Sequence, residues 1–332
     1  MIKSDVLRML EERRGTAISG EAMAQALGVS RAAVCKAVAS LRAEGHLVGS
    51  APRRGYLLEC ESDVLTEEGI RLYLPEAGGV RRVVCLDTVD STNTHAKRLA
   101  LAGAESGTLI AANQQTAGRG RRGRSFLSPA GTGLYMTLLL RPSSSMERFQ
   151  MITVAAGTAV CLAVEELTPL RPLVKWVNDV YLRGRDGVER KVCGILSEAV
   201  SDVESGTVEN VAVGIGLNVT TQDFGPDLND RAGSIFPEGV SRNQLAARIA
   251  ERLMDFSTRL EDPELLRAYR ERSLLLGRRV RWMQDGRCCL GHAVDVDELG
   301  GLVVEGEDGA RRSLRSGEVY EVRPLDGAQP SS

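Results

Sequence analysis

Apolar residues near the start of the chain recur at the spacing of short amphipathic helices. Residues 4–13 carry one such stripe, which predicts a first helix. Ser19 is placed to cap a second helix, with Ile18 and Met23 in position to form a hydrophobic staple across its first turn. Gly28 is expected to end this helix, because glycine accepts the left-handed backbone that commonly follows a last helical turn.

The next apolar stripe predicts a third helix. Ser30 is placed to cap residues 31–43. Within that range Val34, Val38 and Leu41 fall at the i, i+4 and i+7 positions of one buried face.

Two short extended runs follow between residues 46 and 58, around a Ser-Ala-Pro turn. Two helices joined by a glycine-containing turn and followed by a hairpin are the order of a winged helix-turn-helix. We expect that domain over residues 1–62, with a linker helix and loop over residues 63–79.

From residue 80 to residue 275, strand-like and helical runs are interspersed without a regular repeat, which predicts a mixed α/β domain. We expect strands near residues 80–87, 107–114, 133–140, 190–199 and 209–217, and helices near residues 92–102, 147–167 and 241–275. Residues 276–325 contain short runs split by glycine turns, which predicts a small all-β barrel. Residues 326–332 are expected to be a disordered tail.

The composition is that of a soluble globular protein. The 332 residues are 43% hydrophobic and 26% charged, enough for two or three domains with real cores. The longest uncharged stretch, residues 149–164, is too short to span a bilayer, and the first ten residues lack a cationic and apolar leader. We therefore expect a cytoplasmic protein that does not associate with membranes.

Cysteine and histidine limit the chemistry further. The seven cysteines form no C-x-x-C pair, which predicts reduced thiols rather than disulfides or zinc ligands. None of the three histidines lies at ligand spacing from another, so neither a histidine metal site nor a Ser-His-Asp triad is expected.

Positive charge clusters in two places, although the net charge is only −2. One is the first sixty residues, where the third predicted helix exposes small and basic side chains opposite its buried stripe. Such a face suits the major groove of DNA, and the two wing arginines are placed to neutralise phosphates. The candidate DNA contacts are Ser30, Arg31, Ala32, Lys36, Arg53 and Arg54. A docking module whose basic residues are merely solvated is the alternative.

The second basic cluster is the segment QQTAGRGRRGR at residues 114–124. It contains a G-x-G-x-x-G pattern, but a strand rather than a helix is expected next, and no acid occurs before Glu147, so a dinucleotide-binding turn is rejected. Four arginines with interleaved glycines between two apolar strands instead predict a mobile cationic loop that closes around an anionic ligand. A solvated basic turn is the simpler alternative.

This segment resembles the signature loop of biotin-protein ligases. Four other segments resemble further motifs of that family in the same order: DSTN at 90–93, KWVND at 175–179, KVCGIL at 191–196 and GIGLN at 214–218. The first domain also resembles the helix-turn-helix of the bifunctional members that repress biotin synthesis genes. The resemblance implies a catalytic domain of the class II synthetase-like type and a C-terminal SH3-like β-barrel.

The activity that the resemblance implies has two steps. The carboxylate of biotin attacks the α-phosphate of ATP to give biotinyl-5′-AMP, and a lysine of a biotin carboxyl carrier protein, a subunit of acetyl-CoA carboxylase, then displaces AMP. Cations between two anionic reactants supply the electrostatic stabilisation that the first step needs. The mixed anhydride hydrolyses readily, which explains a loop that closes over it.

The resemblance assigns roles to individual residues. Lys191 and Arg121 are the catalytic candidates. The biotin-binding candidates are Ser91, Thr92, Asn93, Gln115, Gly118, Arg119, Gly120, Arg121, Lys191 and Gly194. The ATP-binding candidates are Lys175, Asn178, Asn218 and Arg121, with Asp179 assisting Mg²⁺ through the phosphates. Without the family, the alternatives are helix capping for residues 91–93, an exposed strand end for Gln115 and a solvated hairpin position for Lys191.

Two positions depart from the family pattern. Val177 stands where proline is common, and Phe126 stands where the aromatic residue is often tryptophan. Trp176 and Tyr135 are candidates for the apolar pocket wall, with a core role as the alternative. Residues 220–236 are expected to form a second mobile loop.

The leading hypothesis is a biotin ligase that also binds operator DNA as a homodimer and represses transcription in response to biotin. A ligase for a related acid such as lipoate would share the chemistry. A ligand-sensing transcription factor without ligase activity is the second alternative.

Overall fold

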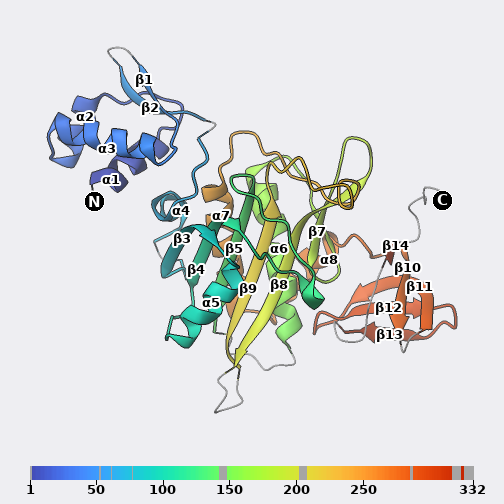
Figure 1. Ribbon diagram of the computed structural model, residues 1–332. Coiled ribbons are helices and arrows are strands. Elements are labelled where there is room, and N and C mark those ends of the chain that lie inside the picture. Colours follow the sequence, from blue (N-terminus) through green and yellow to red (C-terminus); the bar gives the residue numbers. More distant parts are fainter. Residues whose placement is uncertain are drawn as a thin grey trace.

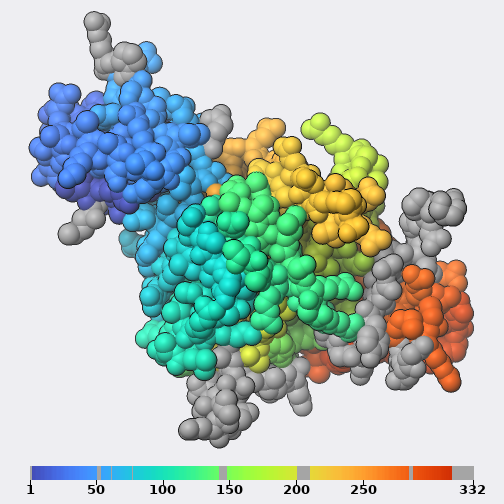
Figure 2. Space-filling model, viewed as in Figure 1, coloured from blue at the N-terminus to red at the C-terminus, as the bar shows by residue number. Residues whose placement is uncertain are grey.

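The computed structural model describes residues 2–51, 54–60, 62–76, 78–141, 148–201, 208–284, 287–315 and 323–324. Their elements form an N-terminal helical domain, a large central domain and a small C-terminal sheet. The two smaller parts lie at opposite ends of the central domain (Figure 1; Figure 2).

The N-terminal domain has the predicted helix order and hairpin. Its elements are α1 (Ile2–Glu11), α2 (Gly20–Leu27), α3 (Arg31–Ala43), β1 (Val48–Ala51) and β2 (Gly55–Leu58). The Ser19 hydroxyl accepts from the backbone N–H of Ala22, and Gly28 ends α2 with φ of 64°. The predicted stripe of α3 is buried in this domain's own core. The helix-turn-helix prediction is confirmed at this level.

The linker contains a shorter helix than predicted. It is α4 (Glu67–Tyr73), capped by Thr66. Backbone groups of the linker bind the start of α7 (Arg242–Thr258): the Thr66 N–H donates to Asn243 Oδ1 at 3.1 Å, and Asn243 Nδ2 donates to the Val64 carbonyl at 2.9 Å. These bonds fix the linker on the central domain.

The central domain is built on a seven-stranded mixed sheet of order β3-β4-β5-β9-β8-β7-β6. The strands are β3 (Arg82–Val89), β4 (Thr108–Gln115), β5 (Gly133–Leu140), β6 (Leu173–Lys175), β7 (Asp179–Arg183), β8 (Glu189–Ser201) and β9 (Val208–Asn218). Only β3 and β4 pair in parallel. The mixed α/β prediction is confirmed, while the short hairpin β6–β7 was not predicted.

Helices cover both faces of this sheet. Along β4, Leu109 belongs to the core with α6 (Phe149–Leu167) and α7, whereas Ile110 packs with α5 (Thr92–Leu101). Successive strand residues point to opposite faces, so the alternation places α5 on one side and α6 and α7 on the other. The start of α5 lies beside the end of β4, where the Thr92 N–H donates to Gln115 Oε1 at 2.8 Å.

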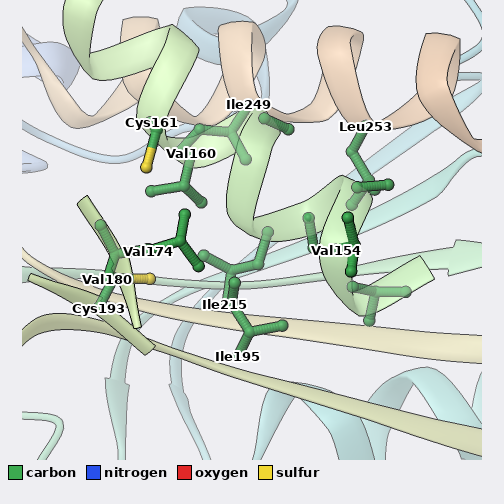
Figure 3. Packing of buried hydrophobic residues seen from close by; sticks show 14 of the residues in the cluster. Val154, Val160, Cys161, Val174, Val180, Cys193, Ile195, Ile215, Ile249 and Leu253 are labelled. Atoms are coloured by element: carbon green, nitrogen blue, oxygen red, sulfur yellow. The ribbon is translucent and has the colours of Figure 1, made fainter. Parts of the chain in front are cut away.

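The larger core lies between the sheet and helices α6 and α7 (Figure 3). Val154 of α6 and Leu253 of α7 are completely buried, and Ile195 and Ile215 face them from β8 and β9. Helix α6 is long and apolar enough to cross a membrane by length and composition, but 72% of that apolar window is buried inside the protein. Burial in this core explains its composition.

The long helix predicted over residues 241–275 is two helices. Helix α7 ends at Thr258, and α8 (Pro263–Glu271) begins with Asp262 as its cap. Proline cannot continue a helix from the preceding turn but suits the first position of a new one. The break therefore follows from Pro263.

The C-terminal strands form a five-stranded antiparallel sheet of order β13-β12-β11-β10-β14. They are β10 (Arg279–Gln284), β11 (Arg287–Val296), β12 (Leu302–Gly306), β13 (Arg311–Leu314) and β14 (Arg323–Pro324). Within the described ranges no pairing joins the outer strands, so the sheet is open rather than the closed barrel expected. The Trp176 indole donates to the Gly300 carbonyl at 2.9 Å and ties this sheet to the central domain.

Candidate active site

A pocket opens where β8, β9 and the end of β4 meet the start of α5. The arginine loop, residues 118–124, crosses it. The pocket is lined by Ser91, Thr92, Asn93, Gln115, Arg119, Gly120, Arg121, Phe126, Asn178, Lys191, Gly194, Ile195, Leu196, Gly214, Ile215 and Gly216. The folded chain thus brings residues from all five motifs to one pocket. KWVND contributes only Asn178, and GIGLN contributes only its first three residues.

One end of the pocket carries uncharged polar groups with fixed orientations. The backbone N–H and hydroxyl of Thr92 both donate to Gln115 Oε1, at 2.8 and 3.1 Å. Gln115 Nε2 donates to the Ser128 hydroxyl at 2.9 Å, and the Thr137 hydroxyl donates to Asn93 Oδ1 at 2.7 Å. Each amide is held by a partner of known polarity, so this end offers a ligand a defined set of donors and acceptors.

Ser91 begins α5 but its side chain makes no capping hydrogen bond. The residue is buried and lines the pocket beside Thr92. Capping therefore does not account for its hydroxyl, and a pocket role fits better.

Glycines leave room for this end of the pocket. A Cβ atom on Gly214 would lie 2.2 Å from Asn93 Oδ1, and one on Gly216 would lie 2.6 Å from the Phe126 ring. Gly194 pairs with Gly216 across β8 and β9. Side chains at these positions would fill the space in which Asn93 and Phe126 lie.

The arginine loop is folded over the pocket. The Gly120 N–H donates to the Arg124 carbonyl at 2.7 Å, and the Phe126 N–H donates to the Gly118 carbonyl at 2.9 Å. Arg121 Nη1 donates to Asn178 Oδ1 at 3.0 Å. After the loop the chain enters β5 rather than a helix, which agrees with rejecting a dinucleotide-binding turn.

Two cations line the opposite end. Lys191 Nζ lies 2.6 Å from Asp179 Oδ1, with about a third of the lysine side chain exposed. Burial lowers the pKa of Arg121, and Arg122 nearby lowers it further, yet a guanidinium remains charged at neutral pH. An anion that enters beside Arg121 and Lys191 therefore meets two positive charges in a partly desolvated site.

Some predicted residues lie away from this pocket's lining. Lys175 Nζ lies over the Tyr181 ring, 5.2 Å from its centroid, and the Asn218 amide donates to the Gly233 carbonyl at 3.0 Å. A Cβ on Gly118 would lie 2.3 Å from the Phe126 carbonyl, so this glycine permits the loop's close packing.

Neither aromatic candidate for the pocket wall reaches it. Trp176 is buried against the C-terminal sheet, and Val177 follows it through a cis peptide bond. Tyr135 is buried behind Phe126, with ring centroids 6.4 Å apart, and its hydroxyl donates to the Pro129 carbonyl. Both residues therefore have the core role that the sequence left open as the alternative.

The segment expected to be a second mobile loop, residues 220–236, is turn-rich and bonded to the sheet. The Lys191 N–H donates to the Arg231 carbonyl at 2.8 Å, and the Gly233 N–H donates to the Lys191 carbonyl at 2.9 Å. The segment thus borders the cationic end by holding the backbone of Lys191.

Two polar residues of the site were missed from the sequence. Thr137 lies mid-strand in an apolar run, and its hydroxyl oxygen also lies 2.8 Å from Thr92 Oγ1. Glu198 on β8 accepts from Asn93 Nδ2 at 2.9 Å and lies near Arg119. In the sequence they are an acid and a threonine within apolar strand runs, and that pattern does not reveal their partners.

The DNA-binding candidates lie on the exposed surface of the N-terminal domain. Arg31, Ala32 and Lys36 are exposed along α3, and Arg54 is exposed beside β2. Ser30 also serves as the helix cap, since its hydroxyl accepts from the Ala33 N–H at 3.2 Å. The remaining candidate, Arg53, lies outside the described residues.

Metal ligands are sparse in the site. Across the described ranges, no three His, Cys, Asp or Glu side chains gather into a group that could hold a metal ion. Asp179 is a single carboxylate with Lys191 beside it. The residues therefore fit a magnesium ion carried mainly by nucleotide phosphates rather than an all-protein metal site.

Comparison with known proteins matches each part of this architecture. Residues 85–218 match the model of the biotin/lipoate A/B protein ligase family, residues 3–57 match an HTH domain, and residues 275–320 match the biotin protein ligase C-terminal domain.

Whole-chain relatives extend the match. The chain is 31% identical to the bifunctional ligase/repressor BirA of Bacillus subtilis, over 94% of this chain and 96% of that protein. It is 29% identical to BirA of Escherichia coli, over 91% and 92%. A biotin protein ligase from Aquifex aeolicus, solved with biotin and ATP, is 30% identical with a TM-score of 0.61, covering 74% of this chain and 99% of that one.

The catalytic fold and the two-ended pocket define a protein ligase of the biotin/lipoate class. The helix-turn-helix and the whole-length match go further. The chain belongs to the bifunctional biotin ligase/repressor family.

Proposed function

We propose that this chain joins biotin to AMP at the expense of ATP, transfers biotin to a lysine of a biotin carboxyl carrier protein, and represses transcription from operator DNA in response to biotin. The observation that carries the ligase proposal is one pocket that is lined both by the uncharged polar side chains of residues 91–93 and 115 and by the cations Arg121 and Lys191. Such a pocket matches a ligand whose neutral ring needs hydrogen bonds and whose tail is a carboxylate.

Biotin has that chemistry. Its ureido ring carries N–H donors and a carbonyl acceptor, which Ser91, Thr92, Asn93 and Gln115 would bind. Lipoate has no such donors or acceptors on its ring, so the hydrogen-bonding capacity that remains at this end of the pocket would go unmatched with lipoate. The polar end therefore favours biotin between the two acids.

In the first half-reaction a carboxylate oxygen of biotin bonds to the α-phosphorus of ATP, and the bond to pyrophosphate breaks. Arg121 and Lys191 would lie between the two anions and offset their repulsion as charge develops on the phosphate oxygens. Asn178, Asn218 and Lys175 are proposed for nucleotide contacts, and Asp179 would assist Mg²⁺, which supplies charge neutralisation at the phosphates.

In the second half-reaction the carrier's lysine amine attacks the acyl carbon, loses a proton, and AMP leaves. The reaction requires no nucleophile from this chain. Arg119, Gly118, Gly120 and Gly194 would complete the biotin site around the adenylate.

The regulatory half rests on the N-terminal domain. Ser30, Arg31, Ala32, Lys36, Arg53 and Arg54 would contact operator DNA, and biotinyl-adenylate would act as corepressor. Homodimerisation belongs to the proposal, because a single helix-turn-helix usually needs a symmetric partner for specificity.

The division of the chain is part of the same proposal. It comprises the DNA-binding domain (1–62), the linker (63–79), the catalytic domain of class II synthetase-like type (80–275), the C-terminal β-sheet domain (276–325) and the tail (326–332). A cytoplasmic location with no membrane association is also proposed.

The test is direct. The purified chain with ATP, biotin and a biotin carboxyl carrier domain should label one lysine, as measured by mass spectrometry, and Lys191→Met should abolish labelling. Absence of labelling with the unaltered chain would end the ligase proposal. Competition between biotin and lipoate separates the two acids, and pyrophosphate release on mixing with ATP and biotin excludes a sensor without catalysis.

A further inference from the structure

Glu198 lies on β8 behind the polar end of the pocket and is bonded to three residues on two other segments. Its carboxylate accepts from Asn93 Nδ2 at 2.9 Å and from Lys97 Nζ at 2.7 Å, both on α5. It also pairs with Arg119 of the arginine loop, at 3.3 Å. The side chain is 17% exposed, whereas that of Arg119 is 48% exposed.

The carboxylate is ionised at neutral pH. Burial alone would raise the pKa of Glu198, but hydrogen bonds from Lys97 and Asn93 and the charge of Arg119 outweigh it and lower the pKa. A fixed negative charge of this kind attracts the guanidinium of the loop, and solvent around the half-exposed Arg119 screens part of that attraction.

Two arginines of the loop have different partners. Arg121 Nη1 donates to Asn178 Oδ1 at 3.0 Å, and the charge of Asp179 also acts on Arg121. Arg119 is held by a charge, that of Glu198. Because Glu198 also binds Asn93, the group that holds the loop is rigidly tied to the polar end of the pocket.

We propose that Glu198 is a positioning residue for the ligase reaction: it holds Arg119 and the arginine loop over the pocket and so retains the acyl-adenylate until the acceptor lysine arrives. The inference rests on the proposed ligase activity. Glu198 does not line the pocket, so its effect passes through Arg119 and Asn93.

The expected consequence of losing this hold is leakage, by which we mean hydrolysis of the adenylate without transfer of biotin to the carrier. When the loop opens early, water rather than the carrier's amine attacks the acyl carbon, and biotin and AMP are released without product. Weakening the hold on Arg119 should therefore raise acceptor-independent AMP formation, which a purely structural defect would lower together with all other activity.

The test compares Glu198→Gln with the unaltered chain. The glutamine keeps an oxygen for Asn93 but removes the charge that holds Arg119. We expect acceptor-independent AMP formation and the KM for biotin each to rise about fivefold. The kcat for carrier labelling should stay within about twofold. These sizes follow because a partly buried ion pair changes an equilibrium by on the order of tenfold or less.

Glu189→Gln is the matched control. Glu189 lies on the same strand with the same 17% side-chain exposure, but it pairs with Arg183 and Arg278 away from the pocket. This variant should leak no more than the unaltered chain. Lys97→Met, which removes a different partner of Glu198, should also leave leakage unchanged.

A double variant guards against a general loss of stability. Glu198→Gln should add no leakage in an Arg119→Ala background, since the interaction is already absent there. Equal leakage in the unaltered chain, Glu198→Gln and Glu189→Gln would overturn this inference alone. An unaltered chain that forms no adenylate would instead overturn the ligase proposal.

Discussion

Replacing Gly214 with alanine should disable the polar end of the pocket without touching a charged group. The added Cβ would lie 2.2 Å from Asn93 Oδ1 and 2.8 Å from its Cγ, closer than real Cβ atoms approach other atoms. Asn93 is buried and held by Thr137, Glu198 and the Leu196 carbonyl, so it cannot move aside without losing those bonds.

Both stability and affinity should fall. Overpacking of this kind costs about 1–3 kcal/mol of unfolding free energy. Loss of the correctly placed amide costs about 1–2 kcal/mol of ligand binding, which corresponds to roughly a 5- to 30-fold rise in the KM for biotin. Denaturant unfolding and adenylate formation at varied biotin concentrations measure the two effects separately.

The cause can be isolated with a double-mutant cycle. In an Asn93→Ala background the clash is absent, so Gly214→Ala should add little further loss of stability or affinity. Gly157→Ala is the control, because its Cβ would meet side-chain methyls of Val174 at 3.3 and 3.6 Å and of Ile195 at 3.7 Å rather than Asn93. Additive losses at Gly214 and Asn93 would refute the steric reasoning.

Three further outcomes are expected. Lys191→Ala should lower kcat for adenylate formation by at least about 100-fold, as measured by pyrophosphate release, because it removes a preorganised charge at the phosphate. Arg31→Ala combined with Lys36→Ala should weaken operator binding and reduce its salt slope by about 2 in gel-shift titrations, while biotinylation stays intact. Arg242→Ala should lower the unfolding free energy by about 3 kcal/mol in denaturant titrations, because the arginine is 3% exposed and binds Asp63; an unchanged midpoint would contradict that role.

The domain order could be predicted because its signals are local. Ser19, Gly28 and Ser30 mark helix ends by their own side chains and backbone preferences, and the structure uses all three. The limits of α7 and α8 were missed although Pro263 was a visible breaker. A continuous apolar pattern outweighed a single residue in that prediction.

The pocket could be predicted only where a motif marked it. Arg121 and Lys191 stand out as charges within repeated patterns, and the fold brings both to one pocket. Thr137 and Glu198 could not be predicted, because their roles depend on partners about 44 and 105 residues away in sequence. The same dependence on tertiary contacts explains why Trp176 turned out to anchor the C-terminal sheet instead of lining the pocket.

The arrangement of Arg121 and Lys191 around the reacting carboxylate and phosphate is tested most directly by a crystal structure with a non-hydrolysable analogue of biotinyl-5′-AMP. We expect Lys191 Nζ and an Arg121 guanidinium nitrogen within hydrogen-bond distance of the oxygens at the acyl-phosphate linkage, with the ring of biotin against Asn93 and Gln115. An analogue bound with both cations turned toward solvent, or with its ring at the cationic end, would contradict the account.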